Sequence, residues 1–339
     1  MIITKKPLLW VVTMLIVINN CLAVDIKPWT ETVVSVSNIS NSARLFRELG
    51  GWRLSEKGTV SRAELDYWKL SDLVSAKYER FCAPQAKIGC IRFIQYTGVE
   101  TRPIRLAKRA WDSGGIYSIM VRSNDVHWLF NQALALGWWA ESEPVEFTFK
   151  GSKLRNVVLT GPDGIQLAVY ERISPPFSGF PVGAISQSFN SMRMVKDKKI
   201  SRDFYEQKLG FKLVFDSAFE PAEPFPSNFG IPFNYTPVIK RSAAALYPIE
   251  GETGRVELMQ LEGFNGVSVA DFARPPNRGI ISVRFPVDNV SSYRSRLIEQ
   301  GVAIAYEAKA LEIVGIGKVD ILAVRDPDGA ITEFYQVIE

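Results

Sequence analysis

The stretch GIYSIMVRSNDVHWLFNQALALG (residues 115–137) recurs in altered form as GIISVRFPVDNVSSYRSRLIEQG (residues 279–301), 164 residues further along the chain. Three other segments of the first half also have counterparts in the second half, in the same order: LFRELGGW and FYEQKLGFKL, GCIRFIQYTG and GRVELMQLEG, GPDGIQLAVYER and DPDGAITEFYQ. The chain therefore consists of two copies of a two-part unit, or four modules. A period of about eighty residues is too long for a solenoid repeat and indicates duplicated domains.

Each module has the pattern of a strand, an amphipathic helix that ends near a glycine, and three further strands. In the first module, Val33 and Val34 lie in the expected first strand, Leu45 and Phe46 lie on one helix face, and Gly50 ends the helix. The same β-α-β-β-β order can be written for the other three modules. In the second and fourth modules, Asn124-Asp125 and Asp288-Asn289 supply residues that commonly begin helices. The pattern predicts an α+β fold of four βαβββ modules.

A segment rich in proline, glycine and serine, Glu171 to Gln187, separates the two halves. We therefore expect an N-terminal domain over residues 24–172, a linker over 173–186 and a C-terminal domain over 187–339, each burying its own core. The second half also contains a long stretch rich in proline and aromatic residues, Glu220 to Tyr247, which has no counterpart of that length in the first half. Such insertions are often lids or binding loops, and the alternative is a permissive surface loop.

The first 23 residues have the layout of a secretory signal. Lys5 and Lys6 precede an apolar run over residues 8–18, and small residues end at Ala23, where we expect cleavage. The run is shorter than the roughly 20 residues of a spanning helix. We expect an exported protein, periplasmic or secreted, and the alternative is a membrane anchor formed by the uncleaved segment.

Charge and cysteine content exclude some classes of function. The formal charge is +4, the signal carries two lysines and no acids, and the chain has no basic stripe, so we expect no nucleic-acid partner. After cleavage Cys82 and Cys90 remain, and in an oxidising compartment this isolated pair predicts a disulfide, with two buried thiols as the alternative. His127 is the only histidine, and we expect it to be solvated or to cap a helix, so a zinc site is not expected.

The segments FYEQKLGFKL and DPDGAITEFYQ, in this order and recurring in both halves, resemble the vicinal oxygen chelate superfamily, which contains glyoxalase I, extradiol dioxygenases and bleomycin-resistance proteins. The resemblance covers almost all of residues 31–339. It implies that modules pair into two cupped mixed β-sheet domains, each cup enclosing a site. In metal-using members of the superfamily, the ligands come from the first and last strands of each module.

The resemblance places candidate site residues at eight positions: Glu31, Ser118, Asn190 and Ser282 in the first strands, and Arg92, Ala168, Glu257 and Glu333 in the last strands. Because none is histidine, they do not match the 2-His-1-carboxylate iron site. In the first half, arginine and alanine replace the last-strand carboxylates, so this half resembles a degenerate site, in which Glu31 and Arg92 can form an ion pair. The second half keeps two carboxylates.

Two functions follow from this asymmetry. In the first, the protein binds a small, largely apolar molecule without a metal, in a C-terminal cup bounded by Asn190, Glu257, Ser282 and Glu333 and covered by residues 225–247. In the second, Glu257 and Glu333 hold a hard cation such as Mg²⁺, Mn²⁺ or Ca²⁺ in a metal-assisted isomerase, lyase or dioxygenase-like enzyme. Without a cation, two facing carboxylates would raise one pKa or turn Arg193 or Arg284 inward as a partner.

Overall fold

The computed structural model describes residues 25–107, 109–220 and 223–338. The expected signal peptide, residues 1–23, lies outside these described residues. None of the helices that are described has both the length and the apolar character needed to cross a membrane.

The four expected modules are present, and they contain the following elements. Module 1 (residues 31–97) contains β1 (Glu31–Ser35), α1 (Ile39–Glu48), β2 (Arg53–Thr59), α2 (Arg62–Tyr67), β3 (Ser75–Cys82) and β4 (Cys90–Thr97). Module 2 (residues 118–174) contains β5 (Ser118–Arg122), α3 (Val126–Ala135), β6 (Trp139–Ala140), β7 (Val145–Phe149), β8 (Ser152–Thr160), the short helix η1 (Pro162–Gly164) and β9 (Gln166–Ser174).

The second half repeats this order. Module 3 (residues 190–262) contains β10 (Asn190–Met194), α4 (Lys198–Asp203), the π-helical turn η2 (Phe204–Lys208), β11 (Lys212–Phe219), the short helix η3 (Phe233–Tyr235), β12 (Lys240–Tyr247) and β13 (Arg255–Glu262). Module 4 (residues 279–337) contains β14 (Gly279–Pro286), α5 (Val290–Glu299), β15 (Ile304–Ile313), β16 (Gly317–Arg325) and β17 (Ile331–Val337). The predicted α+β fold of βαβββ modules is confirmed.

The main helix of each module begins at an asparagine or aspartate. Asn38, Asp125, Asp197 and Asn289 have extended backbones, and each side chain accepts a hydrogen bond from the backbone N–H three residues later. Such a cap satisfies one of the free N–H groups at the start of a helix. The helix starts predicted at Asp125 and Asn289 are confirmed.

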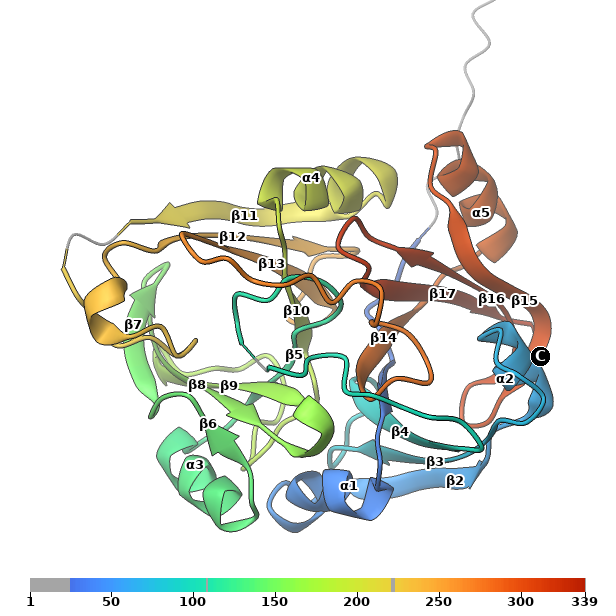
Figure 1. Ribbon diagram of the computed structural model, residues 1–339, viewed down its shortest axis with the longest axis horizontal. Helices are drawn as coiled ribbons and strands as arrows, with labels where there is room; N and C mark the ends of the chain where they lie inside the picture. The colour runs from blue at the N-terminus through green and yellow to red at the C-terminus, as the bar shows by residue number, and fades with distance from the viewer. Residues whose placement is uncertain (1–24, 108, 221–222, 339) are drawn as a thin grey trace, which may run out of the picture.

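The modules pair across the two halves of the chain. One eight-stranded sheet has the order β15-β16-β17-β14-β1-β4-β3-β2, and thus joins modules 4 and 1. The other has nine strands along the path β11-β12-β13-β10-β5-β9-β8-β6, with β7 on β8, and joins modules 3 and 2. At the centre of each sheet the first strands of two modules run antiparallel, β1 with β14 and β10 with β5. Figure 1 shows the two curled sheets, which open toward opposite sides.

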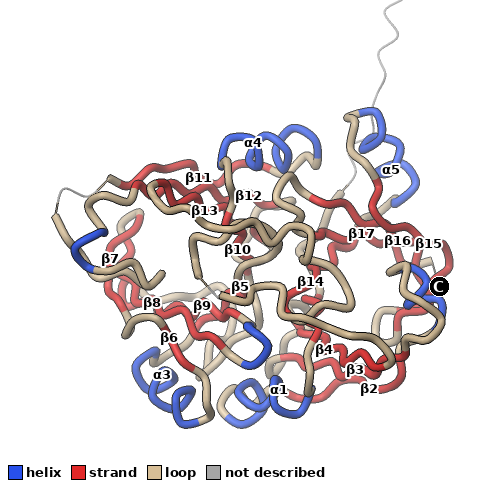
Figure 2. Tube along the Cα trace, in the orientation of Figure 1, coloured by secondary structure: helices blue, strands red, loops and turns tan. Residues whose placement is uncertain are grey.

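This arrangement corrects the expected pairing of modules within each half. Neither residues 24–172 nor residues 187–339 form a sheet of their own. One buried apolar cluster also contains residues of all four modules, for example Phe46, Leu129, Tyr205 and Phe285. The four module helices flank this cluster, with α1 and α3 below the sheets and α4 and α5 above them in Figure 2. The halves therefore share a core instead of burying separate ones.

Two boundaries also differ from the sequence prediction. Strand β9 continues through Ser174, so the connection between the halves begins later than residue 173. Residues 240–247, expected to belong to the insertion, form β12 and pair with both β11 and β13. The insertion proper is therefore residues 220–239.

The predicted disulfide between Cys82 and Cys90 is present, with a Cα–Cα distance of 4.4 Å. It joins the last residue of β3 to the first residue of β4, two antiparallel neighbours in which Phe81 faces Ile91. The bond therefore closes the β3–β4 hairpin at its loop.

We predict that cutting the connection between the halves leaves them associated. A protease site introduced at residues 178–181, in an exposed stretch without strand pairing, should give two fragments that elute together under native conditions and separate only in denaturant. The reason is that both central strand pairs, β1–β14 and β5–β10, join one fragment to the other. Size-exclusion chromatography measures this outcome. Two folded fragments that elute separately would contradict the cross-half pairing.

Candidate functional site

Each sheet curls around a concave face, and we call these faces the 1+4 concavity and the 2+3 concavity after their modules. In Figure 1 the 1+4 concavity opens to the right, where α2 lies, and the 2+3 concavity opens to the left, where residues 223–239 lie. Both covering segments connect the second and third strands of a module, module 1 and module 3 respectively. The two concavities are therefore covered in equivalent ways by unrelated sequences.

The eight positions carried over from the superfamily divide between the two concavities. Four belong to the sheet of modules 1 and 4: Glu31, Arg92, Ser282 and Glu333. The other four belong to the sheet of modules 2 and 3: Ser118, Ala168, Asn190 and Glu257. The expected C-terminal site is thereby corrected, because Asn190 and Glu257 lie in one sheet while Ser282 and Glu333 lie in the other.

Glu31 is the centre of a buried cluster of charges in the 1+4 concavity. Its carboxylate is fully buried and accepts hydrogen bonds from Arg80 Nε at 2.7 Å, Arg92 Nε at 2.8 Å and Arg284 Nη1 at 2.8 Å. Burial would raise the pKa of Glu31, but the charges of Arg92, Arg284 and Arg80 lower it to about 2. The ion pair between Glu31 and Arg92 that the sequence left open is confirmed.

Arg284 connects Glu31 to two more carboxylates. Its Nη2 lies 3.1 Å from Glu64 Oε1 and its Nε lies 3.1 Å from Glu333 Oε2. Glu333 also accepts hydrogen bonds from the hydroxyls of Ser282 and Tyr67. All three nitrogens of the Arg284 guanidinium therefore contact carboxylates, and the inward orientation considered for Arg284 is confirmed.

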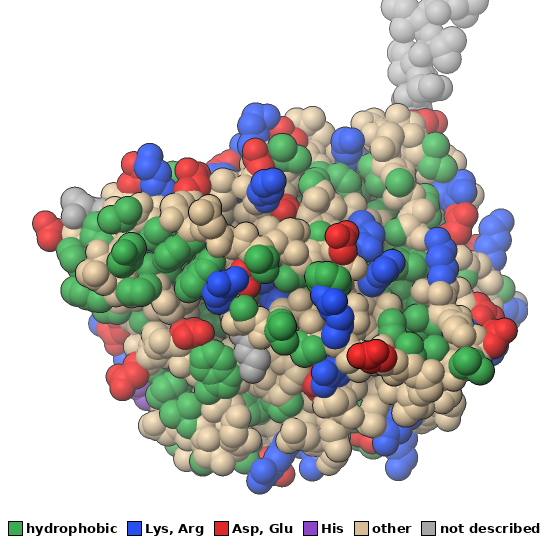
Figure 3. Space-filling model, viewed as in Figure 1, with side chains coloured by type: hydrophobic (Ala, Val, Ile, Leu, Met, Phe, Trp, Pro, Cys, Tyr) green, Lys and Arg blue, Asp and Glu red, His purple; other side chains and the backbone are tan. Residues whose placement is uncertain are grey.

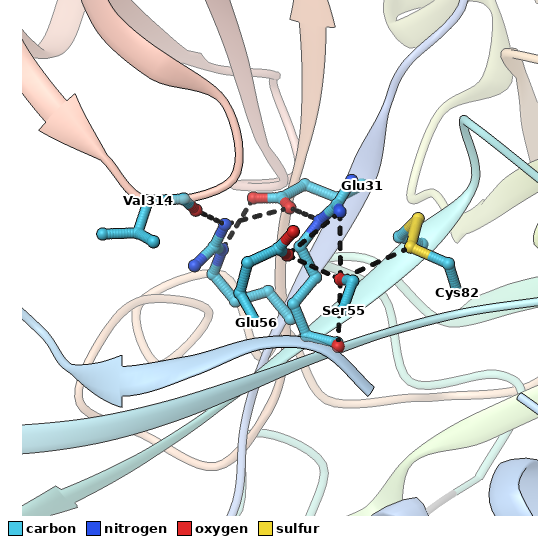
Figure 4. The surroundings of a disulfide bond; sticks show 8 residues. Glu31, Ser55, Glu56, Cys82 and Val314 are labelled. Carbon is cyan, nitrogen blue, oxygen red and sulfur yellow. Dashed lines mark hydrogen bonds and ion pairs between the residues drawn. A yellow bond between two sulfur atoms is a disulfide. The ribbon is translucent and has the colours of Figure 1, made fainter. Parts of the chain in front are cut away.

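The charge cluster extends toward the disulfide. Arg80 Nη1 donates to Ser55 Oγ and Glu56 Oε2, both at 3.1 Å, and the Ser55 hydroxyl lies 3.8 Å from Cys82 Sγ. Figure 4 shows this sequence of contacts from Glu31 through Ser55 to Cys82. The disulfide therefore links β3, the strand that carries Arg80, covalently to β4.

The polar group of greatest interest in the 2+3 concavity is Glu257 on β13. It is partly buried, and its Oε1 accepts a hydrogen bond of 3.2 Å from Asn190 Nδ2, while Asn190 Oδ1 accepts one from the Arg255 backbone N–H at 3.1 Å. Burial raises the pKa of Glu257, and the hydrogen bond from Asn190 and the charges of Arg255 and Arg122 offset part of this rise. Within the described residues, no cation lies at ion-pair distance from Glu257.

The remaining lining of the 2+3 concavity is mainly apolar. Its buried cluster contains Met120 and Met192 from the central strands and Phe229 and Ile231 from residues 220–239. The Ser118 hydroxyl is buried in this sheet and forms no hydrogen bond with the described residues. Residues 223–239 thus cover this concavity, as we expected of the insertion, although over modules 2 and 3 jointly.

The cover of the 2+3 concavity is held at one polar contact. Asn228 Nδ2 donates a hydrogen bond to Asn156 Oδ1 on β8, and Asn156 Nδ2 donates to the Val169 carbonyl at 2.8 Å. The cover, which is part of module 3, is therefore hydrogen-bonded to module 2.

The residues at the carried-over positions do not fit a metal centre in either concavity. In the 1+4 concavity, the carboxylate oxygens that would bind a cation already form ion pairs with arginine side chains. In the 2+3 concavity, Glu257 is the single carboxylate beside a hydroxyl, an amide and a methyl group, whereas hard cations prefer several oxygen ligands. The described residues contain no group of three or more histidine, cysteine, aspartate or glutamate side chains arranged for a metal ion. Glu257 and Glu333, the expected pair of ligands, do not share a site.

Comparison with known proteins identifies the family. Residues 190–334 match the family model of the Glyoxalase/Bleomycin resistance protein/Dioxygenase superfamily. The second half of the chain therefore has the sequence pattern of this superfamily. No curated protein sequence matches the chain.

The similarity to solved structures extends over both halves of the chain. Glyoxalase I from Zea mays superposes with a TM-score of 0.60 at 18% identity, covering 91% of this chain and 92% of the maize protein. A proposed dioxygenase from Bacillus subtilis superposes with a TM-score of 0.55 at 11% identity, covering 94% of this chain and 87% of that one. At these identities the superpositions establish the glyoxalase-like fold of the chain and leave its activity open.

The sequence analysis did not identify Glu64 or Tyr67 as members of the charge cluster. They lie on α2, a six-residue helix that is added to the repeated pattern and has no counterpart in the described parts of modules 2 and 4. The capping pattern SRAE, in which the Ser61 side chain accepts a hydrogen bond from the Glu64 N–H, is the signal that marks this helix. His127 is exposed at the start of α3, where Asp125 provides the cap.

We predict that Arg284→Met destabilises the protein by about 3–5 kcal/mol, because it leaves Glu31, Glu64 and Glu333 buried with fewer counter-charges. The matched control is Arg294→Met, which removes an exposed ion pair with Glu307 at 2.6 Å. The control should cost less than about 1 kcal/mol. Urea unfolding of both variants measures the difference. Equal effects would show that the buried cluster does not stabilise the fold.

We further predict that the protein loses stability in acid through Glu31. Because its pKa is lowered from 4.5 to about 2, its ionised form stabilises the folded state above pH 4.5, and this contribution disappears as the pH falls toward 2. The lost contribution is about 3 kcal/mol. Urea unfolding across this range should show a shallower loss for Glu31→Gln, which is already less stable at neutral pH. Parallel pH profiles would contradict the assignment.

Proposed function

We propose that this protein binds a small, largely apolar molecule in the 2+3 concavity, and that Glu257 receives a cationic or hydrogen-bond-donating group of that molecule. The observation that carries the proposal is the contrast between carboxylates at equivalent positions. Glu31 and Glu333 each lie at ion-pair distance from Arg284, whereas among the described residues Glu257 has the amide of Asn190 as its hydrogen-bond donor and no cation at ion-pair distance. A ligand with an ammonium group would supply the missing counter-charge.

The lining supports an apolar ligand. Methionine side chains adapt to different shapes, and Met120, Met192 and Met259 lie around the concavity. Phe229 and Ile231 of the cover are buried in the same cluster, so a ligand would enter as residues 223–239 move outward. The outer side of the cover is also apolar: Figure 3 shows hydrophobic side chains gathered over this part of the surface, where Phe233, Tyr235 and Val238 are exposed.

The proposal differs from the expected site in the residues it uses. It keeps Asn190 and Glu257 and adds the unpartnered hydroxyl of Ser118, which lies on the adjacent central strand β5. Ser282 and Glu333 are omitted because they are bonded to each other within the buried cluster. An enzyme that uses Glu257 and Glu333 together has no support, because the two residues lie in different sheets.

We also propose that the protein is exported. The support is the signal-like sequence of residues 1–23 together with the Cys82–Cys90 disulfide, since such bonds persist in oxidising compartments.

The proposal predicts selective loss of amine binding in Glu257→Gln. The probes are 4-phenylbutylamine and the uncharged 4-phenylbutan-1-ol, measured by titration calorimetry. The variant should bind the amine about tenfold more weakly because a partly buried ion pair is lost. It should bind the alcohol within about twofold of the parent, since the apolar contacts remain.

The matched control is Glu262→Gln, an exposed glutamate at the end of the same strand β13, which should leave both affinities unchanged. If Glu262→Gln weakens amine binding as much as Glu257→Gln does, or if neither changes it, the ligand does not lie at Glu257.

A further inference from the structure

A hollow of about 350 Å³ lies at the rim of the 1+4 concavity, outside the buried charge cluster. Its wall consists of residues 68–70, which follow α2, residues 274–277, which precede β14, and Tyr306 of β15. Binding pockets for small molecules span about 300–1,000 Å³, so this hollow fits a compact one. No residue of the 2+3 concavity lines it, and it is a site independent of the function proposed above.

The charge of this hollow is positive. Lys69 and Arg274 are the charged residues among the eight that line it, and neither an aspartate nor a glutamate does so. Lys69 Nζ donates one hydrogen bond to the Ala305 carbonyl at 2.9 Å and lies 5.3 Å from the centre of the Tyr306 ring. Arg274 is exposed and its side chain forms no ion pair with any described residue. Both cations therefore retain donors for a ligand.

The other polar groups of the wall are not free to bind a ligand. The indole N–H of Trp68 has no acceptor among the described residues, but its nitrogen is buried and does not open into the hollow. The Asn277 side chain is used within the protein: its amide nitrogen donates to the Phe272 carbonyl at 3.0 Å and its oxygen accepts from the Arg102 N–H at 3.4 Å. Lys69 and Arg274 therefore supply the donors of the hollow, and a complementary ligand carries an anionic acceptor.

The remaining wall residues are apolar, but they present little surface to the hollow. The rings of Trp68 and Tyr306 lie edge to face with centres 5.0 Å apart and are buried, and Leu70, Pro275 and Pro276 complete the lining. The two exposed cations therefore dominate the surface that a ligand would meet.

We infer that this hollow binds a small carboxylate. Arg274 is the partner of the carboxylate, since a guanidinium presents two parallel N–H groups to the two oxygens. Lys69 contributes the second positive charge.

The test uses the full mature chain labelled with ¹⁵N, titrated with naphthalene-2-carboxylate and, separately, with its neutral amide. The indole N–H signal of Trp68, assigned by its disappearance in Trp68→Phe, should shift and saturate with the carboxylate. Arg274→Gln should weaken carboxylate binding about fivefold, as expected for an exposed charge pair, and change amide binding by less than about twofold. Lys69→Gln should act in the same direction.

Two control variants distinguish binding in this hollow from non-specific attraction to surface charge and from binding in the 2+3 concavity. Arg53→Gln, at an exposed arginine on the edge strand β2, should leave the carboxylate affinity unchanged. Glu257→Gln should also leave it unchanged, which keeps this test independent of the amine site. The inference is overturned if the Trp68 signal does not saturate in the millimolar range. It is also overturned if Arg274→Gln weakens the carboxylate and the amide equally, or if Arg53→Gln weakens the carboxylate as much.

Discussion

The ion pair between Glu31 and Arg284 joins the first module to the last. The two residues face each other on β1 and β14, the antiparallel strands at the centre of the 1+4 sheet. Both are fully buried, so removal of either leaves the other charged group away from water with one counter-charge fewer. A pairing of modules within each half would separate these residues and bury unpaired charges. The cluster therefore favours the cross-half pairing over the one that sequence order alone suggests.

Because the 1+4 concavity is filled by this cluster, duplication has produced two concavities of opposite character. In one, the guanidinium of Arg284 lies between the carboxylates of Glu31 and Glu333. In the other, Glu257 keeps an equivalent position without a guanidinium at ion-pair distance. The first arrangement pairs the buried carboxylates with arginines, and the second leaves a carboxyl group whose pKa is raised by burial.

Much of the fold could be predicted because it is encoded locally. The helix caps, the repeated motifs and the Cys82–Cys90 pair each depend on residues close in sequence. The pairing of modules could not be predicted from the sequence. Each module has an equivalent first strand, and the repeats do not specify with which other first strand it pairs. The candidate site was wrong for the same reason: Glu257 and Glu333 were assigned to one cup through sequence order alone. The pairing of Glu31 with Arg92 and the inward orientation of Arg284 were considered from the sequence as alternatives, whereas the contacts of Glu31 with Arg80 and Arg284 were not anticipated.

The covering segments explain why the same fold has a charged cluster in the 1+4 concavity and a mainly apolar lining in the 2+3 concavity. Each connects the second and third strands of its module, and its composition decides what the concavity beneath it becomes. Helix α2 brings Glu64 and Tyr67 to Arg284 and Glu333, so the charges beneath it are matched by side chains of the protein. Residues 220–239 bring Phe229 and Ile231 instead, which exclude water without supplying a charge. An apolar cover over an unneutralised carboxylate raises its pKa, and a cationic ligand is the partner that would lower it again.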